Sequence, residues 1–197
     1  MNKIDENTDA LIVVDVQYDF LPGGALAVPD GNRVIPIVNR LIPLFAKIVT
    51  TQDWHPVNHI SFKARGGIWP PHCVQHTHGA EIHKDLKVKN ALHILKGDDP
   101  DFEAYSGFQG TDLSDRLHMD GVTTVYIAGL ATDYCVKNTV LDALNHRFET
   151  YVIIDAIRGV ELKPGDSEKA LQEMKSAGAY LLKSSDLFSE TLKAIRS

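Results

Sequence analysis

Three residues that could act together in catalysis, an acid, a lysine and a cysteine, each stand at or just after the end of a short apolar run. Asp15 lies near the end of A-L-I-V-V-D-V at residues 10–16, Lys96 follows L-H-I-L, and Cys135 comes shortly after V-Y-I-A. Short apolar runs are typical of strands covered on both faces of a parallel sheet. Because the carboxyl ends of parallel strands meet at one edge of the sheet, we expect these three side chains to share a crevice.

The chemistry that this set supports is nucleophilic catalysis by a thiolate. A cysteine nucleophile needs a base or a field that yields the thiolate, and a positive group nearby. Asp15 can take the thiol proton and return it to a leaving amine, while Lys96 biases both ionisations through its charge. We expect Cys135 in the first turn of a helix that begins after Gly129 breaks the strand, where the helix dipole favours thiolate over thiol. The alternatives are an inert buried thiol, an acid that only caps a turn, and a solvent-facing lysine.

A second group of residues has the types and spacing of metal ligands. Asp53 and His55 are two positions apart at the end of another apolar run, so an extended backbone points both side chains to one side. His72 could complete a set of two histidines and one carboxylate, which leaves coordination positions open and suits Zn(II), Fe(II) or Mn(II). His59 or Ser61 could supply a further contact. The alternative is that these are surface histidines, as we expect for most of the nine in the chain.

Aromatic residues flank the same segments. Phe20 follows the first apolar run, Trp69 lies in the segment that carries His72, and Tyr105 follows Lys96. Aromatic side chains in loops after strand ends could stack on a flat ring, although they could equally fill the core.

The hydrophobic periodicity predicts the elements that must position these residues. Strands are expected at 10–16, 48–52, 92–95, 123–128, 150–154 and 179–182. Helices are expected at 32–47, 111–119, 132–145, 166–177 and 186–195, with Thr111 as an N-cap and Pro43 distorting the end of the first helix. The alternation predicts a three-layer α/β/α fold, with a mostly parallel six-stranded sheet and helices on both faces. The irregular stretch 54–91, rich in Gly, Pro and His, is interpreted as functional because structureless loops of that length are uncommon.

Size and composition fit one domain spanning residues 1–197. The net charge of −6 contains no long block of one sign, which argues against nucleic acid or an anionic membrane as partner. Cys73 and Cys135 are too few for a disulfide framework, and no secretory signal or apolar run of about 20 residues is evident, so we expect a soluble, cytoplasmic protein. The sequence leaves a homo-oligomer open.

With these residues in place, the sequence resembles the nicotinamidase (pyrazinamidase) family of the isochorismatase-like cysteine hydrolase superfamily. The matching segments run in family order over most of residues 10–160. They are D-V-Q-Y-D-F (15–20), G-G-A-L-A-V (23–28), D-W-H-P-x-N-H-x-S-F (53–62), W-P-P-H-C-V (69–74), K-G (96–97), Y-S-G-F (105–108), G-L-A-T-D-Y-C-V (129–136) and D-A-x-R-G-V (155–160).

The resemblance implies hydrolysis of nicotinamide, as in NAD salvage, and of pyrazinamide. It implies that Cys135 is the nucleophile, that Asp15 is the base and then the acid, and that Lys96 is the charged third member. It further implies that a divalent metal, with zinc favoured over iron or manganese, binds the pyridine nitrogen of the substrate. The ligands implied are Asp53, His55 and His72, with Ser61 at a position where family members vary and His59 two residues earlier.

The resemblance also implies the groups around the substrate. The ring pocket would be lined by Phe20, Leu26, Trp69, Tyr105 and Ala131. A cis peptide at 130–131 or 131–132 would aim the backbone N–H groups of Ala131 and Cys135 at the carbonyl oxygen as an oxyanion hole. The alternatives are a metal-free amidase of the same superfamily acting on ureido or carbamoyl substrates, and a non-catalytic ligand-binding homologue.

Overall fold

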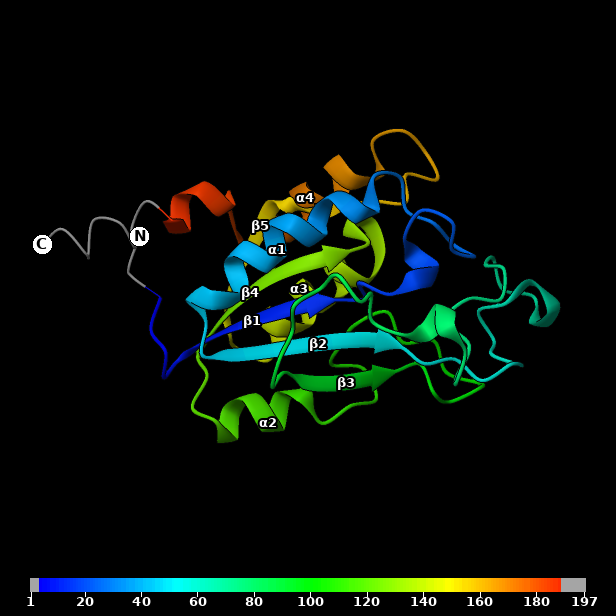
Figure 1. Ribbon diagram of the computed structural model, residues 1–197, viewed down its shortest axis with the longest axis horizontal. Helices are drawn as coiled ribbons and strands as arrows, with labels where there is room; N and C mark the ends of the chain where they lie inside the picture. Colours follow the sequence, from blue (N-terminus) through cyan, green and yellow to red (C-terminus); the bar gives the residue numbers. More distant parts are fainter. Residues whose placement is uncertain (1–3, 189–197) are drawn as a thin grey trace, which may run out of the picture.

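The computed structural model describes residues 4–188, and its centre is a six-stranded sheet in which every neighbouring pair is parallel (Figure 1). The strand order is β3-β2-β1-β4-β5-β6. The strands are β1 (Asp9–Val14), β2 (Lys47–Asp53), β3 (Leu92–Lys96), β4 (Thr124–Leu130), β5 (Glu149–Arg158) and β6 (Tyr180–Leu182). The predicted sheet, mostly parallel and six-stranded, is confirmed.

Helices cover both faces of the sheet, as the alternating pattern predicts. They are α1 (Val34–Leu41), α2 (Leu113–Met119), α3 (Lys137–Asn145) and α4 (Asp166–Ala177). The buried residues of α1 pack in one core with Leu11 and Val13 of β1, whereas those of the other three helices pack in a second core with Ala10, Ile12 and Val14. Successive side chains of β1 therefore enter opposite cores, which explains why the strand reads as a continuous apolar run.

Two predicted helix boundaries differ from the structure. The helix expected over 32–47 ends at Leu41, and a 3-10 turn that contains Pro43 follows it, so Lys47 already begins β2. Pro43 cannot donate the backbone hydrogen bond that a continuing helix needs. The predicted terminal helix at 186–195 is helical over 184–188, and its remaining residues lie outside the described part of the chain.

The predicted cap at Thr111 and the predicted strand break at Gly129 are also corrected. The helix α2 begins at Leu113 after Asp112, while the Thr111 hydroxyl accepts a hydrogen bond from the Leu113 N–H at 3.3 Å. The strand β4 continues through Gly129 to Leu130. Gly129 has φ +116°, and a Cβ there would lie 2.1 Å from the carbonyl oxygen of Val14, so only glycine lets the two strands pair at this point.

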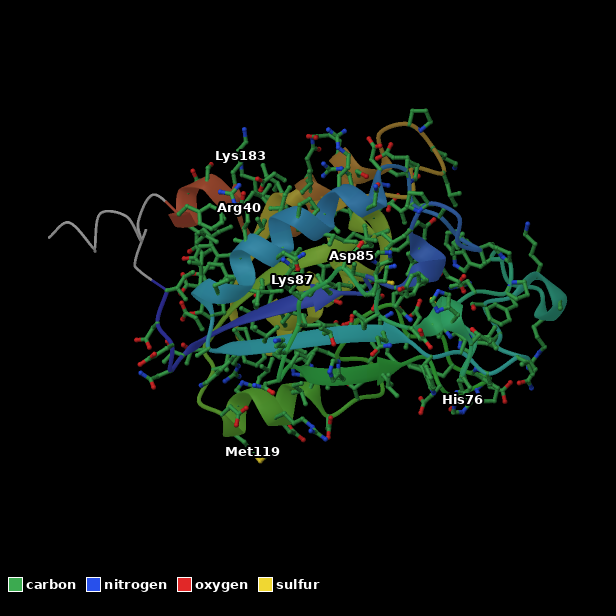
Figure 2. All side chains as sticks on the ribbon, viewed as in Figure 1. Arg40, His76, Asp85, Lys87, Met119 and Lys183 are labelled. Atoms are coloured by element: carbon green, nitrogen blue, oxygen red, sulfur yellow. The ribbon has the colours of Figure 1, made fainter. Side chains whose placement is uncertain are left out.

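The long segment between β2 and β3 has only short 3-10 turns and isolated bridges as regular structure. Its first part extends beyond the carboxyl ends of β1–β3, and its last part returns across the face that α1 covers (Figure 1). Figure 2 labels Asp85 and Lys87 on this returning part, and the Asn39 amide of α1 binds the Asp85 carbonyl and the Lys87 N–H. In the part of the chain described, no helix is long and apolar enough to cross a membrane.

Candidate active site

The acid, the lysine and the cysteine predicted to converge do so at the carboxyl edge of the sheet. Lys96 Nζ lies 3.0 Å from Asp15 Oδ2 and 3.4 Å from Cys135 Sγ. Asp15, Lys96 and Cys135 are 0%, 1% and 5% exposed. Three segments that are far apart in the sequence thus place an acid, an ammonium and a thiol in contact, shielded from water.

Asp15 is held by its backbone and by its side chain. The strand β1 stops at Val14, and Asp15 takes a left-handed backbone conformation with φ +48°, which is uncommon for a residue other than glycine. Its N–H donates to the Thr51 carbonyl at 3.2 Å, and the Thr51 hydroxyl donates to Asp15 Oδ1 at 2.6 Å. Among the described residues, no group donates a well-oriented hydrogen bond to Oδ2, whose contact with Lys96 is an ion pair. The second oxygen is therefore free to accept a proton.

Lys96 is the positive centre of the site. Its ammonium also pairs with Asp53 Oδ1 and donates to the Ala104 carbonyl at 3.2 Å. Burial by itself would lower the pKa of Lys96, but Asp15 and Asp53 outweigh it and raise the pKa well above its ordinary value. The side chain therefore remains a cation. It is buried, so the alternative of a solvent-facing lysine is wrong.

Cys135 lies in a π-helical turn, Thr132–Val136, that leads directly into α3. Its pKa is raised well above the ordinary value because burial outweighs the attraction of Lys96, and Asp15 adds to the rise. Burial therefore opposes the effect expected of the helix end. The raised pKa favours the thiol over the thiolate, so a nucleophile at this position needs a base.

The base within reach is Asp15. One carboxylate oxygen each of Asp15 and Asp53 and the sulfur of Cys135 all lie within 4.8 Å of one another. Burial raises the pKa of Asp15, and Lys96 opposes that rise only in part. A carboxylate whose pKa is raised is a stronger base than an exposed one, which suits it to exchange a proton with a thiol.

Beside this group, Asp53, His55 and His72 form a buried cluster whose ligand atoms lie within 4.8 Å of one another. Asp53 Oδ2 lies 3.5 Å from His55 Nε2 and 3.8 Å from His72 Nε2. His55 Nδ1 lies 2.9 Å from the Gly97 carbonyl and His72 Nδ1 lies 2.8 Å from that of Pro70, so each Nδ1 carries the proton that it donates. In the neutral imidazoles each Nε2 then directs a lone pair toward Asp53, and hydrogen bonds from Nδ1 to backbone carbonyls are typical of histidines that bind metals.

The negative charge of Asp53 among these three residues also suits a cation. Burial would raise the pKa of Asp53, but Lys96 and His55 hold it well below its usual range. Burial lowers the pKa of His72, whereas at His55 the neighbouring Asp53 outweighs burial and raises it. A carboxylate and imidazole lone pairs are the donor set of zinc and of other first-row divalent ions.

The two additional ligands expected from the sequence are placed differently. His59 Nε2 lies 3.0 Å from the Phe102 carbonyl, and the Ser61 hydroxyl lies 2.7 Å from His59 Nδ1, so both ring nitrogens are occupied. The His59 ring stacks on that of His55, with 4.0 Å between the ring centroids. His59 therefore packs against His55. Among the described residues, it is not part of the cluster of candidate ligands. Ser61 keeps oxygen lone pairs and lines the neighbouring cleft.

The three predicted aromatic residues fall into two groups, Phe20 beside His72 and Trp69 with Tyr105. Phe20 packs near His72, with 5.5 Å between the ring centroids, and the Trp69 indole N–H donates to the Tyr105 hydroxyl at 3.0 Å. Both Trp69 and Tyr105 line a cleft of about 510 Å³ and contact the ring of Tyr134. Tyr134 was not predicted to be part of the site, although its position next to Cys135 could have indicated it.

The remaining predicted residues lie close to the same edge. Leu26 packs, half-buried, against the core on the α1 side, and Ala131 is 6% exposed. The cis peptide is at Leu130–Ala131, one of the two expected positions. The N–H groups of Tyr134 and Val136 donate to the Ala131 carbonyl. The two predicted oxyanion donors, the N–H groups of Ala131 and Cys135, do not take part in these two hydrogen bonds.

Gln17 is a further residue whose part in the site was not predicted. It is fully buried, and its amide donates to the carbonyls of Asp53 and Ala80 while its oxygen accepts from the Asp53 N–H at 2.8 Å. The side chain thereby ties the backbone of a metal-ligand candidate to the long segment. Its position directly after the apolar run 10–16 could have indicated a buried polar side chain.

A parallel α/β sheet with a buried Asp–Lys–Cys group at its carboxyl edge defines the class of protein as a cysteine hydrolase. The isochorismatase domain family matches residues 9–186, and this chain belongs to that family. The nicotinamidase of Escherichia coli (strain K12) is 41% identical over 87% of this chain and 93% of its own length.

Two solved structures are similar throughout. The pyrazinamidase of Pyrococcus horikoshii in complex with zinc is 56% identical, covers 89% of this chain and 98% of its own, and has a TM-score of 0.84. The structure of PnC1 from L. infantum in complex with nicotinate is 38% identical, covers 93% of this chain and 96% of its own, and has a TM-score of 0.88.

Proposed function

We propose that this protein hydrolyses nicotinamide to nicotinate and ammonia through a thioester on Cys135, and that it also accepts pyrazinamide. The observation that carries the proposal is the contact of Lys96 with both Asp15 and Cys135, directly beside the Asp53, His55 and His72 cluster. The relatives named as nicotinamidase and pyrazinamidase support the choice of substrate.

In the first half of the reaction, Asp15 Oδ2 accepts the thiol proton of Cys135 and the sulfur forms a bond to the carboxamide carbon. The electron pair of the carbonyl moves to its oxygen, where the N–H groups of Ala131 and Cys135 stabilise the negative charge. Asp15 then gives its proton to the nitrogen, the C–N bond breaks and ammonia leaves.

In the second half, Asp15 takes a proton from water as the water oxygen attacks the thioester. The C–S bond then breaks, and the sulfur recovers the proton from Asp15. Lys96 remains charged throughout, because its two carboxylate partners keep its pKa well above the ordinary value, so it can stabilise the thiolate and the carboxylate in turn.

We propose that Asp53, His55 and His72 hold one divalent metal ion and that the ion is zinc, since their donor atoms fit it and a similar pyrazinamidase is a zinc complex. When bound, the ion supplies a Lewis-acid position for the pyridine nitrogen of the substrate. In this arrangement Phe20, Trp69 and Tyr105 pack around the ring, and Leu26 closes its edge.

We also propose a single-domain, cytoplasmic enzyme, which is supported by a sheet built from residues 9–182 and by two unpaired cysteines. Its partner is a small molecule and neither nucleic acid nor a membrane, consistent with the net charge of −6.

The test is ammonia release after addition of nicotinamide to the zinc-loaded protein, with Cys135→Ala as the control. Wild type should release ammonia and nicotinate in equal amounts, whereas the variant should release neither. Hydrolysis of a ureidoacrylate substrate, measured in parallel, distinguishes a nicotinamidase from the alternative of a metal-free amidase. Turnover of that compound without turnover of nicotinamide would contradict the proposed substrate.

A further inference from the structure

Thr51 makes a shorter contact with the carboxylate of the proposed base than Lys96 does. It lies on β2 directly opposite Val14, the residue before Asp15, and it is fully buried. Its hydroxyl donates to Asp15 Oδ1 at 2.6 Å, and its carbonyl accepts the Asp15 N–H at 3.2 Å. One residue thus restrains Asp15 at the backbone and at the carboxylate.

The rotamer of Thr51 depends on the absence of a side chain at Gly107. A Cβ at Gly107 would lie 2.7 Å from the Thr51 methyl carbon, so the methyl occupies the space that a side chain would take. The Gly107 N–H donates to the Thr139 hydroxyl at 3.0 Å, which fixes the backbone there. Because Thr is branched at Cβ, a rotation that moved the methyl would also move the hydroxyl away from Asp15.

We propose that Thr51, in a rotamer for which Gly107 leaves the space, is a positioning residue that orients the Asp15 carboxylate for proton exchange with Cys135. This inference rests on the proposed function. It assigns the two carboxylate oxygens different tasks: Oδ1 is tied to Thr51, and Oδ2 exchanges the proton. Without the hydroxyl, the carboxylate is free to rotate or to form a second bond with Lys96, and the thiol loses its acceptor.

The primary test compares Thr51→Val with Thr51→Ser. Valine keeps the shape and removes the donor, so kcat for nicotinamide should fall about 10- to 100-fold, the effect of one hydrogen bond to a charged group, while KM changes less than about threefold. Serine keeps the donor and should remain within about fivefold of wild type. Thr50→Val is the matched control, because Thr50 is also buried but its hydroxyl contacts His93. It should leave kcat unchanged.

The role of Gly107 gives an independent double-variant test. Gly107 has no left-handed φ, so its backbone tolerates alanine, but the new Cβ must displace the Thr51 methyl. Gly107→Ala should therefore lower kcat by a similar factor. In Gly107→Ala/Thr51→Ser the methyl is gone and the next neighbours of the Cβ lie at 3.5 Å and 3.8 Å, which are ordinary contacts. The double variant should regain about tenfold in kcat over Gly107→Ala alone.

Alkylation of Cys135 by iodoacetamide separates this inference from the substrate assignment. The sulfur displaces iodide and forms a C–S bond, while Asp15 accepts the thiol proton, and no metal or nicotinamide takes part. The rate at Cys135, followed by mass spectrometry in zinc-loaded protein of verified metal content, should fall about tenfold or more in Thr51→Val and remain near wild type in Thr51→Ser.

Equal alkylation rates and equal kcat values in Thr51→Val and wild type would overturn the positioning role. Equal losses in the valine and serine variants would do the same, because they would trace the effect to packing. If wild type does not hydrolyse nicotinamide but the alkylation rates follow the expected order, the proposed substrate fails and the role of Thr51 stands.

Discussion

Lys96 and Asp15 form an ion pair with 3.0 Å between Nζ and Oδ2, and both side chains have no exposed surface. The same ammonium also pairs with Asp53 of the candidate metal cluster and contacts the sulfur of Cys135. One cation thus links the proposed catalytic group to the proposed metal site. Two buried carboxylates share its charge, so loss of the ammonium should be costly.

Lys96→Met should inactivate and destabilise the protein. Removal of the ammonium leaves Asp15 and Asp53 buried without their common partner, and breaking a buried pair costs about 3–5 kcal/mol. Urea denaturation should report that loss in the free energy of unfolding. Lys96→Arg should not restore turnover, because a planar guanidinium cannot contact two carboxylates and the sulfur as a compact ammonium does. Wild-type stability in Lys96→Met would contradict the buried pairing.

Cys135→Ala should remove turnover while leaving the fold and ring binding intact. The sulfur is the proposed nucleophile, whereas the proposed ring contacts come from Phe20, Trp69 and Tyr105. Calorimetry should find nicotinate bound to the variant with a Kd within about threefold of wild type, and ammonia assays should find no activity. Cys73→Ser is the control, since the Cys73 sulfur contacts the Gly79 carbonyl whereas Lys96 contacts the sulfur of Cys135, so Cys73 should not contribute to turnover. Residual turnover above about 1% of wild type would remove Cys135 from its proposed role.

His72→Asn should reduce zinc content and raise KM for nicotinamide together, because His72 Nε2 is one of three buried donor atoms. His76→Asn is the matched control. His76 is exposed, has φ +64°, which asparagine tolerates, and is labelled at the periphery of Figure 2. Metal analysis by mass spectrometry and steady-state kinetics check both variants. Chelation of wild type should reproduce the His72 result, and readdition of zinc should reverse it.

The acidic limb of kcat/KM should lie at a higher pH than 3.8, the ordinary pKa of an aspartic acid side chain. The reaction needs Asp15 ionised, and burial raises its pKa, so activity should fall as pH drops through that raised value. A pH profile between about 3.5 and 8, measured where the fold is stable, checks this. An acidic limb at or below pH 3.8 would show that burial does not raise the pKa of the base.

Asp15→Asn should abolish turnover without lowering the melting temperature at pH 7. A carboxyl whose pKa is raised by folding contributes stability below its unfolded pKa and loses that contribution as pH rises through the folded pKa. Ionised Asp15 is therefore unfavourable for folding at pH 7, and the amide removes that cost while Lys96 keeps Asp53 as a partner. The melting temperatures of the variant and of wild type, measured by thermal unfolding at pH 7, check this. A large drop in melting temperature would mean that the Lys96 pair outweighs burial.

Much of this protein was predictable from local patterns in its sequence. Apolar runs and their spacing predicted six strands, and the polar residues at the ends of those runs predicted that Asp15, Lys96 and Cys135 would meet. This succeeded because parallel strands place their carboxyl ends at one edge whatever their separation in sequence. Helix ends were less predictable, as the early end of α1 at Leu41 shows, because they depend on how a single proline interrupts a continuing apolar pattern.

Tertiary structure alone decided which atoms face one another and which groups are charged. No local pattern connects the residues in these contacts. They are the hydrogen bond from Thr51 to Asp15, the close approach of the Thr51 methyl group to Gly107, and the hydrogen bonds between Gln17 and Asp53. The raised pKa of Cys135 likewise follows from burial, a property of the packed molecule that opposes the local effect of a helix end. Sequence periodicity determines where strands end, but the distances and the dielectric surroundings of the side chains exist only after the segments pack together.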